Sequence, residues 1–239
     1  VTTPAAAHLA WPSYGQSALA AEGYGASLGT SGEQTPVPMA SITKIVTALV
    51  VLEKKPITNG TGETISFTAN DITIYNEQLA QDGMVLPVST SMSLTQYQVL
   101  QGMLVHSANN YAESLAVWAY GSMPTYLTAA NAYLDEHGLA QTTVMDASGI
   151  STDSKSSATD LVKLGQLALA NNVVADIVSQ KTATIPGVGT IYSTNLLLGT
   201  NDVIGIKTGT TDEAGACLLY AVQIAVGSKT ITVVGVTLG

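Results

Sequence analysis

The apolar, strand-like runs of this chain lie at its two ends, while helical periodicity fills its middle. Residues 202–207, 216–226 and 229–238 are rich in β-branched and apolar residues, with a Gly-Ser turn at 227–228. Near the start, residues 16–28 hold shorter β-compatible stretches that Gly23 and Gly25 interrupt. This distribution predicts one antiparallel sheet that is built from the two chain ends.

The middle of the chain predicts helices. Residues 41–54 are apolar at almost every position around the helical wheel, which indicates a buried helix. Pro124 suits the first turn of a later helix, and Gly138 suits its C-cap. We therefore predict a mixed α/β fold in which helices flank the sheet and a mostly helical lobe is inserted. The other segments with helical spacing are residues 94–106, 110–120, 124–137 and 157–170.

The chain divides into a short spacer and one large domain. Residues 1–15 are rich in Thr, Ala and Pro, and we interpret them as a spacer. The first residue is Val1, which is typical of a product trimmed after a signal peptide, although a cut made elsewhere would look the same. Residues 16–239 are expected to form a single domain. Its sheet part would take in about 16–64 and 196–239, and its helical lobe about 65–195.

Composition excludes several classes of partner and site. Seventeen acidic residues against eight lysines, with no arginine, give a net charge of -9, so a basic surface for nucleic acid or anionic membranes is not expected. The single cysteine, Cys217, excludes an internal disulfide and any multi-cysteine metal site. His8, His106 and His137 are too scattered for a metal site. The chain is therefore expected to need no metal and no cofactor.

Three short motifs bring together residue types that suit nucleophilic catalysis. By chance, a chain of this composition holds about one Ser-x-Asn and roughly 0.1 Lys-Thr-Gly, so no single match is decisive. Their setting adds weight, because the first opens the buried helix, the second falls between two helices and the third lies on a strand. The motifs are Ser41-Ile42-Thr43-Lys44, Ser107-Ala108-Asn109 and Lys207-Thr208-Gly209.

The first motif has a physical reason for its spacing. Lys44 lies three residues after Ser41, so both side chains share one helix face and the amine reaches the hydroxyl. A lysine takes a proton from serine when burial and a nearby cation lower its pKa, and Lys207 is the candidate cation. The alternative is a helix N-cap at Ser41 with a solvated Lys44, which an apolar helix disfavours. For Ser107 and Asn109 the alternative is a helix-helix turn, and for Lys207 an edge-strand lysine.

Taken in this order, the motifs resemble the signature of the serine penicillin-binding proteins and serine β-lactamases. Within that group the chain is most similar to the low-molecular-mass D-alanyl-D-alanine carboxypeptidases. The similarity runs from about Ser17 to Gly239 and implies a β-lactamase/transpeptidase-like fold for the catalytic domain. The stretches that carry it are residues 38–44, 104–110, 146–150, 157–161, 205–211 and 214–215.

The resemblance implies a role for each motif residue. Ser41 would attack the carbonyl of the penultimate D-Ala of a peptidoglycan stem peptide, and Lys44 would accept its proton. Ser107 would pass a proton to the departing D-Ala amine, while Asn109 would hold Lys44 and the substrate amide. The backbone N–H groups of Ser41 and Thr210 would form the oxyanion hole. The substrate and its terminal carboxylate would be bound by Lys207, Thr208, Gly209 and Thr210.

The implied activity is that of a serine-type D-Ala-D-Ala carboxypeptidase, which works through an acyl-enzyme on Ser41. Its partners would be the stem peptide and β-lactams, which would acylate the same serine, and not nucleic acid. Because peptidoglycan lies outside the membrane, the resemblance implies an extracytoplasmic location. Any membrane anchor would lie outside this chain.

Several departures from the family pattern keep alternatives open. Relatives often bind the substrate carboxylate with an arginine. This chain has no arginine, so Lys207 and threonine hydroxyls would have to bind the carboxylate. Asn110 stands where many relatives have Asp. No glutamate lies between Glu136 and Glu213, where one common class of β-lactamase carries its deacylating base. A β-lactamase, a transpeptidase of the same fold and a non-catalytic penicillin-binding sensor remain as alternatives.

A few further residues have two interpretations. Asp146 and Asn195, near the motif loops, either line the cleft or stabilise turns. His106 is expected to form a hydrogen bond at a helix end, and Cys217, in an apolar strand, is expected to be inert.

Overall fold

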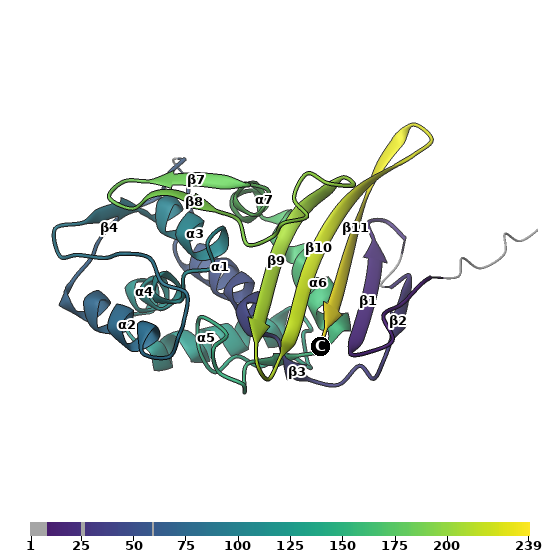
Figure 1. Cartoon of the computed structure of the whole chain (residues 1–239), viewed down its shortest axis with the longest axis horizontal. Helices are drawn as coiled ribbons and strands as arrows, with labels where there is room; N and C mark the ends of the chain where they lie inside the picture. The colour runs from purple at the N-terminus through teal and green to yellow at the C-terminus, as the bar shows by residue number, and fades with distance from the viewer. Residues whose placement is uncertain (1–8, 25–26, 59) are drawn as a thin grey trace, which may run out of the picture.

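Strands from the two chain ends form one five-stranded antiparallel sheet, as the sequence predicts (Figure 1). The computed structural model describes residues 9–24, 27–58 and 60–239. The strand order is β2-β1-β11-β10-β9, and β1 pairs with β11 so that Gln16 lies opposite Leu238. The strands are β1 (Gln16–Ala21), β2 (Gly29–Ser31), β9 (Val203–Thr211), β10 (Gly215–Val226) and β11 (Lys229–Leu238).

Helices make up most of the rest of the molecule and meet around one central helix (Figure 1). Helix α1 packs against α3, α4, α5 and α6, and its residues from Thr43 to Leu52 are all buried, which confirms the predicted buried helix. Helix α6 packs on β1, β10 and β11 and so covers the sheet. The helices are the 3₁₀ turn η1 (Ala40–Ile42), α1 (Thr43–Lys54), α2 (Ala69–Leu79), α3 (Gln96–Leu104), α4 (Asn109–Tyr120), α5 (Met123–Glu136), α6 (Ala158–Ala170) and α7 (Asn172–Val178).

Local sequence explains where several helices begin and end. The Ser157 hydroxyl accepts a hydrogen bond from the backbone N–H of Asp160 and caps α6. Pro124 lies in the first turn of α5, where a missing N–H costs no intrahelical hydrogen bond. Gly138 follows α5 with a φ of +67°, the left-handed conformation that ends many helices.

Two predicted helix boundaries are wrong, because short elements precede the helices. The segment 94–106 starts as a strand: β5 (Ser93–Thr95) pairs with β4 (Thr64–Ser66) before α3 begins. The segment 41–54 starts with η1 rather than with α1. Elements too short to show a clear period were not predicted. They include α7, the hairpin of β7 (Thr182–Ile185) and β8 (Gly189–Tyr192), and the pair β3 (Val37–Pro38) and β6 (Lys155–Ser156). Helix α2 was not predicted either, because only Ile74 and Gln78 of its residues are buried and its apolar pattern is correspondingly weak.

Among the described helices, none alone combines the length and hydropathy of a membrane span, and α6 with α7 reaches them only across a 103° bend. Residues 1–8 of the predicted spacer, and Gly25, lie outside the described residues.

Candidate active site

The three motifs, far apart in sequence, meet at one cleft of about 870 Å³ between the edge strand β9 and the helices. Two lysines, Lys44 and Lys207, lie buried beneath its surface with 0% and 1% of their area exposed. Both therefore act from inside the protein rather than from solvent. The motif residues that line the cleft are Ser41, Ser107, Asn109, Thr208, Gly209 and Thr210.

Ser41 lies on a strained turn at the entrance to α1. The preceding residue, Ala40, has a φ of +47°, which is uncommon for a residue with a Cβ. The Ala40 carbonyl accepts a hydrogen bond from Thr43 Oγ1 at 2.8 Å. Gly149 packs so closely on this carbonyl that a Cβ there would lie 1.9 Å from the oxygen. Contacts from two sides thus hold the conformation that presents Ser41 to the cleft.

The Lys44 amine is held by three oxygen atoms from three separate segments. Its Nζ lies 2.8 Å from Ser41 Oγ, 2.7 Å from Asn109 Oδ1 and 2.6 Å from the Ser148 carbonyl oxygen. Asn109 and Ser148 offer only acceptors in these contacts. A neutral amine has two N–H bonds, so donating both of them to Asn109 and Ser148 leaves its lone pair facing the Ser41 hydroxyl.

The surroundings favour that neutral form. Burial, followed by the charge of Lys207, holds the pKa of Lys44 well below its usual value, while Asp146 and Glu113 act in the opposite direction. The charge of Lys207 acts on the pKa of Lys44 in the direction that the sequence predicts, although burial is the larger cause. Lys44 therefore combines the position and the electrostatic setting of a general base.

Ser107 and Lys207 form a second serine-lysine pair at the same cleft. Ser107 lies between α3 and α4 with a φ of +69°, and Lys207 Nζ donates to its hydroxyl at 2.9 Å. Lys207 also donates to the Thr208 carbonyl at 3.0 Å. Burial lowers the pKa of Lys207 to about 7, so near neutrality both its forms are populated, and a bound carboxylate would favour the ammonium.

Strand β9 forms the opposite wall of the cleft. Thr208 Oγ1 lies 2.7 Å from Thr194 Oγ1, so one hydroxyl donates to the other. Gly209 lies against the Ser41 turn: a Cβ there would come within 2.9 Å of the Ser41 backbone nitrogen. The missing side chain thus makes room for the Ser41 turn itself. Thr210 is exposed on the cleft surface.

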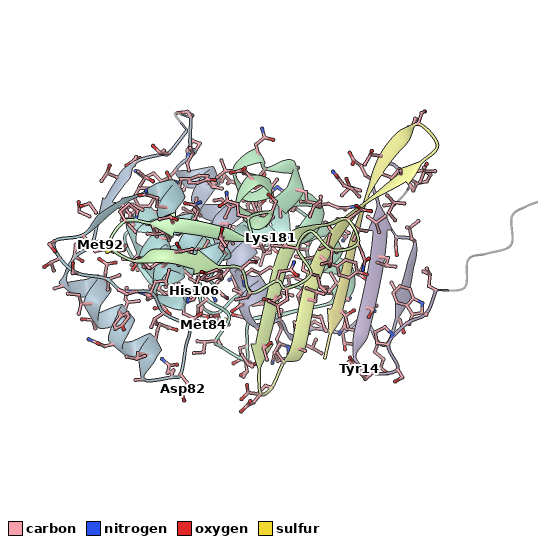
Figure 2. The ribbon with its side chains drawn as sticks, turned by 45° about the horizontal axis from the view of Figure 1, so that its top comes forward. Tyr14, Asp82, Met84, Met92, His106 and Lys181 are labelled. Atoms are coloured by element: carbon pink, nitrogen blue, oxygen red, sulfur yellow. The ribbon has the colours of Figure 1, made fainter. Side chains whose placement is uncertain are left out.

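Figure 2 labels Asp82 and Met84 on the segment that follows α2, and His106 on the turn that carries Ser107. The Met84 carbonyl accepts a hydrogen bond from the Asn109 N–H at 2.7 Å, so this segment borders the cleft and supports the start of α4. The Asn110 amide exchanges hydrogen bonds of 3.0 and 2.8 Å with the backbone of Leu86. An aspartate at position 110 would accept one of these bonds and lack the N–H for the other.

Sequence reasoning missed the Ser148 carbonyl and the Thr194 hydroxyl. The first is a backbone atom, and the second is a threonine in a loop, so neither carries a sequence signal of its own. Asp146 stabilises the loop of Ser148, since its carboxylate accepts from the N–H groups of Ser148, Gly149 and Ile150. Asn195 stabilises its own turn by accepting from Leu197 N–H, and it also lines the cleft.

The cleft brings together side chains of the kind that acyl transfer uses. It holds a hydroxyl nucleophile, an amine beside it, a second hydroxyl and a buried cation. Among the residues that the structure describes, no three His, Cys, Asp or Glu side chains gather in a way that could hold a metal ion.

Comparison with solved structures places the fold. The Streptomyces K15 DD-transpeptidase superposes with a TM-score of 0.83 and 25% identity, covering 97% of this chain and 92% of that protein. Penicillin-binding protein D2 from Listeria monocytogenes, in its ampicillin-bound form, superposes with a TM-score of 0.78 and 26% identity, covering 97% and 91%.

Comparison with curated proteins by sequence also finds DD-peptidases. D-alanyl-D-alanine carboxypeptidase DacA of Escherichia coli (strain K12) is 27% identical over 180 residues, which are 74% of this chain and 44% of DacA. Other relatives, 29–30% identical, are D-alanyl-D-alanine endopeptidases, of which the chain covers 60–66%. This chain therefore spans only part of the curated relatives named here. Residues 16–238 match the peptidase S11 family, D-alanyl-D-alanine carboxypeptidase, and the chain belongs to that family of serine DD-peptidases.

Proposed function

We propose that the chain is a D-Ala-D-Ala carboxypeptidase, which removes the terminal D-Ala of peptidoglycan stem peptides through an acyl-enzyme on Ser41. One observation carries the proposal. Lys44 Nζ donates to Asn109 and to the Ser148 carbonyl while it lies 2.8 Å from Ser41 Oγ, which is the arrangement a neutral base requires.

Acylation uses the two hydroxyls in sequence. The Lys44 amine takes the Ser41 proton as Oγ bonds to the carbonyl carbon of the penultimate D-Ala. The C–N bond then breaks, and Ser107 passes its proton to the departing amine. The proton on Lys44 then returns to Ser107 through the bound substrate or a water molecule, because Ser107 itself is hydrogen-bonded to Lys207, and Lys44 is again neutral when the acyl-enzyme has formed.

Apart from the Ser41 N–H, the binding groups lie on strand β9. The N–H groups of Ser41 and Thr210 hold the developing oxyanion, a contribution of roughly 3 kcal/mol for one such donor. The charge of Lys207, with the Thr208 and Thr210 hydroxyls, binds the terminal carboxylate. A water molecule that enters where the D-Ala amine has left can then give its proton to Lys44 and attack the ester.

A second candidate is endopeptidase action on the same kind of bond, because relatives at 29–30% identity carry that activity in their names. The two differ in the leaving group: a free D-Ala for a carboxypeptidase, and a longer amine for an endopeptidase. Parallel assays with a linear peptide ending in D-Ala-D-Ala and with a cross-linked dimer separate them. Adding an acceptor amine detects transpeptidation by its condensation product.

The test is release of free D-Ala from a diacyl-D-Ala-D-Ala peptide, together with the intact mass of the protein after incubation with penicillin. The wild type should release D-Ala and gain one long-lived penicillin adduct on Ser41. Ser41→Ala should do neither, while Ser66→Ala, which alters an exposed serine on β4, should behave as the wild type does. An adduct on another serine contradicts the proposal, rapid adduct loss favours a β-lactamase, and penicillin binding without D-Ala release favours a sensor.

We further propose that residues 16–239 act as one catalytic domain on the outer side of the membrane, where peptidoglycan lies. Its ligands there are the stem peptide and β-lactams. The ampicillin-bound form of the Listeria protein supports the second of these.

A further inference from the structure

An acid and an amide lie behind the base, and the reaction steps above do not use them. Glu113 lies one helical turn after Asn109 on α4. Gln78 of α2 donates a hydrogen bond from Nε2 to Glu113 Oε1. Gln78 is 3% exposed, and Glu113 is partly buried. A charged or polar pair removed from solvent in this way is costly unless each group is satisfied.

The other end of the Gln78 amide faces Asn109. Gln78 Oε1 has no hydrogen-bond partner within the described part of the chain. A Cβ on Gly83 would lie 3.1 Å from this oxygen and 2.7 Å from Asn109 Nδ2, so both atoms border the space that the glycine leaves clear. An acceptor and a donor on the two sides of one small space attract each other. Gln78 therefore bonds to Glu113 through its NH₂ group, while its oxygen lies near the Asn109 amide that holds Lys44 without a direct hydrogen bond to it.

We propose that Glu113, acting through Gln78 and Asn109, is a positioning residue that supplies the counter-charge when Lys44 takes the Ser41 proton. This inference rests on the proposed function. An ionised Glu113 accepts the Gln78 N–H and thereby keeps the Gln78 carbonyl toward Asn109. When Glu113 is protonated, its O–H can instead donate to the Gln78 oxygen. The Gln78 amide would then be rotated by half a turn, and its NH₂ group would face the NH₂ group of Asn109.

The charges that face Glu113 come from three elements. Burial, then Asp146 on the loop before β6 and Glu77 on α2, raise the pKa of Glu113 to about 7, and Lys44 on α1 opposes them. In return Glu113 and Asp146 raise the pKa of Lys44, against the larger lowering by burial and Lys207. The acid thus titrates in the range where the enzyme would work, and its ionised form favours a protonated Lys44.

The pH profile of acylation by a chromogenic cephalosporin, measured by stopped flow on the whole chain, tests the proposal. Glu113→Gln should move the acidic limb of the acylation rate to lower pH by about half a unit or more, because Lys44 loses an attractive charge. The rate on the plateau should fall several-fold, since the ammonium formed during attack is less stabilised. Glu136→Gln, which removes an exposed acid at the end of α5, is the control and should leave the profile unchanged.

A second variant tests the hydrogen bond between Gln78 and Glu113 without removing the acid. Gln78→Met keeps the length of the side chain but loses the N–H that stabilises the Glu113 carboxylate, so it should move the limb in the same direction. If Glu113→Gln does not fold, Gln78→Met decides. An acidic limb that stays at the wild-type pH, or rises, overturns the inference. A wild type that is not acylated at all contradicts the proposed function instead, so the two failures are distinct.

Discussion

The two walls of the cleft are built on different principles. The wall that carries Ser41 and Ser107 consists of turns, and Ala40 and Ser107 have φ angles of +47° and +69°. The wall formed by β9 is a regular antiparallel strand, with Thr208 opposite Leu218 and with Gly209 opposite Cys217. Groups that form and break bonds in our proposal thus lie on strained turns held by tertiary contacts, whereas groups that bind substrate lie on a strand held by its ladder.

The two buried lysines repeat this contrast. The contacts of Lys44 come from the Ser41 turn, α4 and the loop before β6. Lys207 contacts Ser107 and the carbonyl of the residue that follows it. In our proposal, Lys44, which is fixed in one geometry, therefore suits proton transfer, while Lys207 acts mainly through its charge.

The largest effect should come from removing Lys44, the proposed general base. Lys44→Ala removes the group that accepts the Ser41 proton, and the acylation rate should fall by about 10²–10⁴-fold. Lys229→Ala, at an exposed position in the β10–β11 hairpin, should leave the rate unchanged. Stopped-flow acylation with a β-lactam measures both. Retention of most of the rate in Lys44→Ala would mean that another group is the base.

Removing the charge of Lys207 on strand β9 should have a smaller effect. Lys207→Met keeps the side-chain volume but removes the cation, so kcat/KM for a peptide with a free C-terminal carboxylate should fall by about 10–100-fold. Steady-state D-Ala release measures this. A substrate whose terminal carboxylate is converted to an amide should lose much less from the same change. Equal losses for both substrates would argue against Lys207 as the carboxylate anchor.

The buried lysine of the sheet wall should also appear in the pH dependence of stability. Between pH 7 and 10.5 native Lys207 has largely lost its proton while the unfolded chain keeps it, so the free energy of unfolding should rise with pH. Its slope is at most about 1.4 kcal/mol per pH unit from this group. Glu113 acts oppositely between pH 4.5 and 7, where the native state holds a proton that the unfolded state releases.

Urea unfolding at several pH values measures these slopes. Lys207→Met should lose much of the rise above pH 7, whereas Lys229→Met should keep it. Glu113→Gln should lose the decrease in the free energy of unfolding that Glu113 causes as the pH rises from 4.5 to 7. Unchanged slopes in both buried variants would show that neither group has the shifted pKa that the structure indicates.

The smallest effect should come from the threonine pair on the sheet wall. Thr194→Val removes the hydroxyl that pairs with Thr208 and should lower kcat/KM by about 2–10-fold, the effect of one neutral hydrogen bond. Thr190→Val, at an exposed position on β8, is the matched control. D-Ala release at low substrate concentration is the measurement. A loss as large as that of Lys207→Met would contradict the order of effects expected here.

The sequence predicts the parts of the site that depend on local spacing and composition. Lys44 reaches Ser41 because the two are three residues apart, and the apolar helix around Lys44 already indicates burial. The sheet from the two chain ends follows from the distribution of β-rich runs. These features depend on periodicity, which a single sequence displays.

The rest depends on tertiary contacts that a single sequence does not display. The left-handed conformations at Ala40 and Ser107 occur at residues other than glycine, so composition gives no sign of them. The Ser148 carbonyl reaches Lys44 across 104 positions of sequence. Glu113 does offer a signal, since it is an acid one turn after Asn109 on a helix that is otherwise largely buried.

The central claim is that Lys44 is a neutral amine in the resting protein, and titration of its side-chain nitrogen by NMR tests it most directly. With lysine labelled at Nζ and Cε, and with Lys44→Ala used to assign the signal, the account predicts a Lys44 resonance of a free amine at neutral pH, shifted well away from that of exposed lysines such as Lys229. A Lys44 that stays fully protonated up to the pH at which exposed lysines titrate would contradict the account.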